Sequence, residues 1–135
     1  MSSSLVGLER QRLVRGRLLE EIRRRRLPGA GGWSHCGAQI GTEPTSLATL
    51  ALYSSPSGPR VTPEDLAPLI VRQAPNGLWS AVGDGAAGGN FWATAMAANT
   101  LMVLGAAPET FAGSLTALFH CRPLEASWQI GRAHV

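Results

Sequence analysis

Hydrophobic and polar positions alternate along the chain with helical periodicity and divide it into helices of two kinds. Residues 62–73, and a second stretch that begins at 108, repeat apolar side chains every three or four positions, which predicts helices with one face in water. Residues 45–53 and 91–104 are rich in alanine and nearly free of charge, which predicts helices buried on every side. The pattern therefore predicts an all-α chain with an outer layer of half-polar helices and an inner layer of buried ones.

Residues 5–26 form a longer stretch of helical periodicity at the start of the chain. We expect this segment to be the outer helix of a first helix pair. Its apolar stripe is expected to consist of Leu8, Leu13, Leu18, Leu19 and Ile22.

Tryptophan recurs in a similar local setting at Trp33, Trp79 and Trp128, with spacings of 46 and 49 residues. Two positions before each tryptophan stands a small residue, and six positions before stand Leu27, Gln73 and Arg122. Each unit is predicted to consist of a helix, a turn with the pattern small-x-Trp, a loop and a second helix. Self-similarity at a fixed period predicts a repeat architecture.

Residues 73–79 match Q-x-x-x-G-x-W, the second half of the QW motif of squalene and oxidosqualene cyclases, and the chain thus resembles the prenyltransferase/squalene-cyclase (terpene cyclase/mutase) superfamily. The segments 27–33 and 122–128 are similar to degenerate copies of the motif. The resemblance implies an α/α toroid of helix pairs around an apolar cavity, in which the glutamine satisfies backbone groups at a neighbouring helix end and the tryptophan packs between repeats. The structural motif residues are then Gln73, Gly77, Trp79, Gly31, Trp33 and Trp128.

The chain holds about two and a half such helix pairs, which cannot close a ring of the kind that the resemblance implies. We therefore expect an N-terminal fragment of a longer repeat protein, with a basic N-terminal helix in residues 1–27 and the repeats in residues 28–128. Residues 130–135 resemble the translation of a sequencing adapter, so residues 129–135 are expected to be a non-native tail.

Positive charge is concentrated at the start of the chain. Residues 5–27 hold eight Arg and three Glu, a net charge of +5, whereas the remaining four Arg and six acidic residues give −2. A nucleic-acid-binding domain would carry basic residues over a whole face with aromatics among them, so no nucleic-acid partner is expected. A basic amphipathic helix can bind anionic lipid, which predicts peripheral membrane contact; the alternative is an ordinary solvated outer face. Without an apolar signal segment, the expected location is cytoplasmic or peripheral at a membrane.

The resemblance implies that the parent protein is an isoprenoid (terpene) cyclase-like enzyme that binds an isoprenoid or lipid ligand, but the acidic D-x-D-D-type motif of squalene-cyclase relatives is absent from this chain. Glu43, at the start of an inner helix, is a weak candidate acid; its alternative role is to cap that helix. Phe91 and Trp92 are candidate cavity aromatics, able to stabilise carbocations through their ring faces, and their alternative role is packing between helices.

Two His-Cys pairs raise the question of zinc, since zinc accepts both ligand types. They do not lie at equivalent positions of the repeat, and no D-x-C sequence accompanies them, so no metal and no cofactor are expected. The pairs are His35-Cys36 and His120-Cys121. The alternative to an enzyme is a non-catalytic helical repeat protein that acts as a binding or scaffold module.

Overall fold

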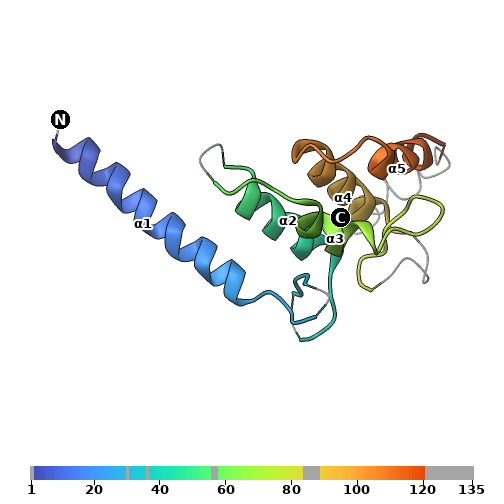
Figure 1. The fold of residues 1–135 in the computed structure, drawn as a ribbon, viewed down its shortest axis with the longest axis horizontal. Helices are drawn as coiled ribbons and strands as arrows, with labels where there is room; N and C mark the ends of the chain where they lie inside the picture. The colour runs from blue at the N-terminus through green and yellow to red at the C-terminus, as the bar shows by residue number, and fades with distance from the viewer. Residues whose placement is uncertain (1, 30, 36, 56–57, 84–88, 121–135) are drawn as a thin grey trace, which may run out of the picture.

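The fold is known from a computed structural model, which describes residues 2–29, 31–35, 37–55, 58–83 and 89–120. These residues form helices and no strand, and one isolated bridge joins Gly41 to Val82. The expected all-helical fold is confirmed (Figure 1). The helices are α1 (Ser2–Arg24), α2 (Thr42–Tyr53), α3 (Pro63–Ile70), α4 (Phe91–Val103) and α5 (Glu109–His120).

The two uncharged or nearly uncharged helices, α2 and α4, pack against each other. Small residues allow this close approach: Ser46 and Thr49 of α2 and Ala97 and Ala98 of α4 are all buried. The half-polar helices α3 and α5 contact α2 and α4 respectively. The prediction that residues 45–53 and 91–104 are buried on every side is wrong, because Leu47 of α2 is 49% exposed and Met102 and Val103 of α4 are 47% and 57% exposed.

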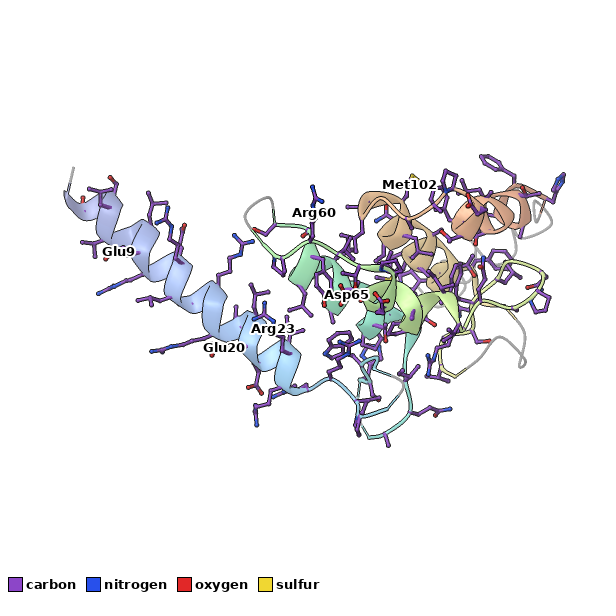
Figure 2. All side chains as sticks on the ribbon, in the orientation of Figure 1. Glu9, Glu20, Arg23, Arg60, Asp65 and Met102 are labelled. Carbon is purple, nitrogen blue, oxygen red and sulfur yellow. The ribbon has the colours of Figure 1, made fainter. Side chains whose placement is uncertain are left out.

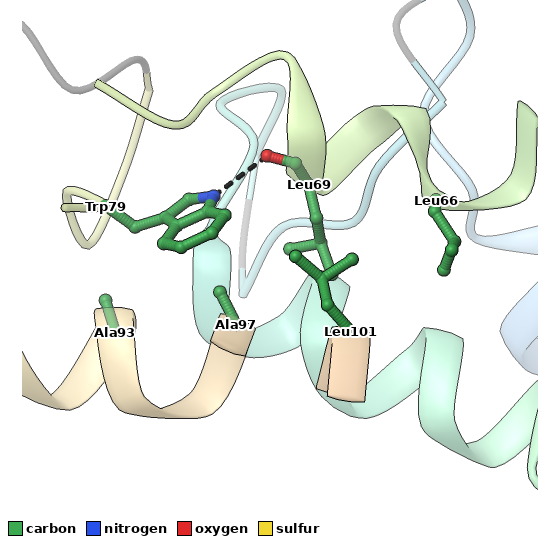
Figure 3. Close-up of a cluster of buried hydrophobic side chains, with 6 residues drawn as sticks. All are labelled: Leu66, Leu69, Trp79, Ala93, Ala97 and Leu101. Carbon is green, nitrogen blue, oxygen red and sulfur yellow. Dashed lines mark hydrogen bonds between the residues drawn. The ribbon is translucent and has the colours of Figure 1, made fainter. Parts of the chain in front are cut away.

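Each helix pair has its own hydrophobic cluster around one tryptophan. In the second pair, Trp79 packs with leucines of α3 and small residues of α4, and the buried members are Leu66, Leu69, Trp79, Ala93, Ala97 and Leu101 (Figure 3). In the first pair, Trp33 packs with Ala48 and Leu52 of α2, and the partly buried Leu19 and Ile22 of α1 lie against them. A tryptophan between an outer and an inner helix is therefore the centre of both clusters.

Helix α2 begins at Thr42, three residues before the predicted start. Pro44 lies in its first turn, where a missing N–H costs no helical hydrogen bond because those N–H groups have no acceptor within the helix. The start is anchored on the second unit, since the Thr42 N–H donates to the Ala81 carbonyl over 2.9 Å and the Thr42 hydroxyl donates to the Ser80 carbonyl. Tertiary contact, which local pattern does not reveal, thus decides this boundary.

The prediction of a continuous apolar stripe on the first helix is wrong for most of its length. Leu8, Leu13 and Leu18 are more than half exposed, and only Leu19 and Ile22 pack against the body of the protein. The reason is length: α1 has 23 residues, whereas the helix on which it packs, α2, has 12. The N-terminal half of α1 therefore projects away from the other helices (Figure 1).

Several sequence predictions concern residues outside those that the structure describes. They are the third tryptophan and its preceding arginine, both cysteines and the terminal tail: Trp128, Arg122, Cys36, Cys121 and residues 129–135.

Candidate functional site

Trp79 joins the outer helix α3 to the inner helix α4 by three hydrogen bonds. Its indole Nε1–H donates to the Leu69 carbonyl near the end of α3 over 2.8 Å. Its backbone N–H donates to Thr94 Oγ1 over 2.9 Å, and its carbonyl accepts from the Asn90 N–H over 2.8 Å. Because the indole is fully buried, its N–H requires such a partner, and it uses the Leu69 carbonyl near the helix end, which also accepts from the Arg72 N–H over 3.1 Å.

Trp33 repeats this arrangement in the first helix pair. Its indole Nε1–H donates to the Ile22 carbonyl over 2.7 Å, and its backbone N–H donates to Thr45 Oγ1 over 3.0 Å. Its carbonyl accepts from the Gly41 N–H over 2.8 Å. We call this set of three hydrogen bonds the tryptophan junction, and both described copies of the repeat contain it.

Thr45 and Thr94 belong to the junction and were missed by sequence reasoning. Each is the fourth residue of its inner helix, so the signal lay in the sequence: α2 starts Thr-Glu-Pro-Thr and α4 starts Phe-Trp-Ala-Thr. The two helices can therefore be aligned from their first residues. In that alignment Glu43 and Trp92 occupy the same position, the second of each inner helix.

In the first helix pair, the residue equivalent to Gln73 is not the expected Leu27. Gln73 Nε2 donates to the Gly77 carbonyl over 3.2 Å and to Ser114 Oγ of α5 over 2.8 Å. In the first pair Arg26, rather than Leu27, has this role, because Arg26 Nε donates to the Gly31 carbonyl over 2.6 Å. The Ile22 carbonyl that accepts from the indole lies eleven residues before Trp33, whereas the Leu69 carbonyl lies ten residues before Trp79, and the equivalent position is correspondingly seven residues before Trp33.

Both motif glycines adopt a left-handed backbone, with φ of 79° at Gly31 and 87° at Gly77. A Cβ atom on Gly77 would lie 2.7 Å from the carbonyl carbon of Gly113 in α5, so this position also permits close approach of the next outer helix. The Arg26 guanidinium lies 5.5 Å from the centre of the Trp33 ring and covers its face.

The first turns of α2 and α4 place an acid beside an aromatic ring. Trp92 is 63% exposed, which is unusual for the largest apolar side chain, and its indole N–H donates to Glu43 Oε2 over 3.3 Å. Phe91 is partly buried next to it in sequence. The structure thus brings Glu43 and Trp92 together across the two inner helices.

The candidate metal ligands are not brought together among the described residues. His35 and His120 are exposed, and no group of three His, Cys, Asp or Glu side chains that could hold a metal ion occurs in the described part of the chain.

The fold and the junctions define an all-helical protein in which two consecutive helix pairs are joined by the same tryptophan geometry. Comparison of the chain with protein-family models, with curated proteins and with solved structures finds no significant match in any of the three.

Proposed function

We propose that this chain forms part of the wall of an α/α toroid in a protein of the isoprenoid-cyclase type, and that the starts of its inner helices contact an isoprenoid ligand. The repeated tryptophan junction supports the proposal, because it fixes each inner helix to its outer helix in the same register. Successive inner helices then present equivalent positions on one side of the layer. The D-x-D-D-type acid is absent from this chain, so the proposed contribution is to ligand binding.

The observation that carries the proposal is the exposure of Trp92 beside Glu43. Burying a large aromatic ring contributes about 2 kcal/mol or more, so a ring left 63% exposed at the start of α4 favours a binding surface. The hydrogen bond to Glu43 fixes the indole and leaves its faces free to contact an apolar chain or a cation.

The test is binding of farnesol to the purified protein, followed by isothermal titration calorimetry. We expect saturable binding that Trp92→Ala weakens by about tenfold, because the ring supplies apolar contact area. Phe119→Ala is the matched control, since Phe119 is an equally exposed aromatic on the outer helix α5 and should not affect binding. Absence of saturable binding, or equal losses in the two variants, would contradict the proposal.

We also propose that α1 contacts anionic membrane surfaces. Its support is the exposure of Leu5, Leu8 and Leu13 together with the arginines of the same helix. No helix in the described residues combines the length and the apolar character needed to cross a bilayer. Sedimentation with anionic and neutral vesicles tests this contact, and equal recovery in both supernatants would exclude it.

A further inference from the structure

A groove separates the C-terminal half of α1 from the segment that connects α2 to α3. Its volume is about 260 Å³. Three arginines, Gly16 and Leu19 form the α1 side, and Leu52, Ser55, Gly58 and Pro59 form the opposite side. The arginines are Arg12, Arg15 and Arg23, and the apolar residues are Leu19, Leu52 and Pro59.

The three arginines reach the groove because of their spacing along α1. Arg12, Arg15, Leu19 and Arg23 follow one another at intervals of three or four residues, which places them on a single face of the helix. Figure 2 labels Arg23 near the C-terminal end of α1, on the side nearer α2. The other arginines of the helix, including Arg10 and Arg17, do not line the groove.

Among the described residues that line this groove, none is acidic. Glu21 forms its ion pairs with Arg24 and Arg25, outside the groove. Within the described residues, none of the three groove arginines forms a salt bridge. Three arginines that line one groove, with no carboxylate among its described lining residues, create a positive potential, which an anion entering the groove would relieve.

We propose that this groove, hereafter the arginine groove, is a binding site for an organic phosphate, with the phosphate held by Arg12 and Arg15, one turn apart on α1, and with Arg23 adding positive charge further along the groove. Guanidinium groups match phosphate oxygens through paired N–H donors, and two of them balance a doubly charged phosphate monoester. The organic part of the ligand lies against Leu19, Leu52 and Pro59. The site is distinct from the inner-helix surface around Trp92 and does not depend on the isoprenoid proposal.

The same chemistry is offered by a soluble phosphate ester and by a lipid headgroup, and the experiment separates them. Isothermal titration calorimetry in phosphate-free buffer uses inorganic phosphate and phenyl phosphate as soluble probes. Phosphatidylcholine vesicles with and without phosphatidic acid provide the lipid surface. We expect saturable binding of both soluble probes, with phenyl phosphate the tighter because its ring gains apolar contact in the groove.

The decisive comparison uses two double variants with the same loss of charge on the same helix. Arg12→Gln/Arg15→Gln removes two groove arginines, and Arg10→Gln/Arg17→Gln removes two arginines from other faces of α1. We expect the first to weaken phenyl phosphate binding about tenfold or more and the second to leave it within about twofold. Circular dichroism of both variants checks that the helix is retained.

Absence of saturable binding of either soluble probe would overturn the proposal, and so would equal losses in the two double variants, since these indicate unspecific charge attraction. Equal affinities for inorganic phosphate and phenyl phosphate would overturn the assignment of the apolar side chains. Given specific binding of the soluble probes, retention on phosphatidic acid vesicles that only the groove variant abolishes assigns the site to a lipid headgroup. No retention, or retention that the groove variant does not reduce, assigns it to a soluble phosphate.

Discussion

Two threonines on α4, Thr94 and Thr100, are completely buried but differ in hydrogen bonding. Thr94 Oγ1 accepts from the Trp79 N–H, whereas Thr100 Oγ1 is buried without a hydrogen-bond partner. We predict that Thr94→Val destabilises the protein by about 1–3 kcal/mol, because the buried Trp79 N–H loses its acceptor. Thr100→Val should be neutral or stabilising by about 1 kcal/mol, because it removes an unpaired hydroxyl.

Urea unfolding followed by circular dichroism measures both changes. The two substitutions are the same in chemistry and lie on one helix, so differences in helix propensity cancel. Similar losses in both variants would mean that the Thr94 hydroxyl does not stabilise the tryptophan junction.

Gly77 and Gly29 are a second pair of positions whose substitutions can be compared. Both have positive φ, but a Cβ atom would touch Gly113 at Gly77 and nothing within 4 Å at Gly29. We predict that Gly29→Ala costs about 1–2 kcal/mol through backbone strain alone. Gly77→Ala should cost a further 1–3 kcal/mol, roughly, because α5 must move outward. Equal free energies of unfolding for the two variants would contradict the close packing of α5 on this turn.

At the scale of the elements, the start of α3 depends on one carboxylate. Asp65 accepts from the Thr62 N–H and hydroxyl in a capping box and from the Tyr53 hydroxyl of α2. Partial burial alone would raise the pKa of Asp65, but these hydrogen bonds outweigh it and hold the pKa below its ordinary value. The carboxylate therefore joins the cap of an outer helix to an inner helix.

A pH dependence follows from this depressed pKa. The stabilisation is complete above the pKa of an unfolded Asp, about 4, and is lost as the pH falls through the lower pKa of the folded state. We predict that Asp65→Asn makes the urea midpoint less sensitive to acidification from about pH 5 to about pH 2. Glu64→Gln removes the same charge from the same turn without these bonds and should retain the acid sensitivity of the natural chain.

Local sequence signals predict most of the helices but not the residues at which each helix begins and ends. The predicted stretch 62–73 begins at the N-cap of α3, Thr62, because capping is a local interaction. The start of α2 was missed because Thr42 is held by Ser80 and Ala81, which lie almost forty residues further along the chain. The role of Arg26 was missed for another reason, since the spacing from the helix-end carbonyl to the tryptophan is eleven residues in the first unit and ten in the second.

At the scale of the whole molecule, the N-terminal half of α1 stands apart from the body. Its side chains extend with no other helix beside them (Figure 2). We predict that deleting residues 2–11 changes the free energy of unfolding by no more than about 0.5 kcal/mol, because Leu5 and Leu8 contribute little buried area. Leu19→Ala, at the packed end, should cost about 1–2 kcal/mol.

Thermal unfolding of the shortened chain and of Leu19→Ala checks this contrast. A large loss of stability on deletion would indicate that the projecting half is covered by another molecule, which size-exclusion chromatography of the natural chain at several concentrations would reveal.

The candidate site was predictable in part. The tryptophans and glycines of the motif stand out because a rare residue recurs at a near-constant spacing. That Glu43 and Trp92 meet was not predictable, since it depends on the packing of α2 against α4 across 49 positions of sequence. The arginine groove was not predictable either. The sequence shows that the first helix is rich in arginine, but the groove also depends on the segment between α2 and α3 that lies opposite α1.

Gln73 and Arg26 make different contacts, and this difference predicts which helices separate first when the molecule is pulled from its two ends. Gln73 binds its own turn and also α5, so the second unit is tied to the element that follows it. Arg26 hydrogen-bonds within its own turn among the described residues, and α1 is held mainly through Leu19, Ile22 and the Trp33 indole. Tension applied to the two ends should therefore peel α1 away first, while α3, α4 and α5 separate together at a higher load.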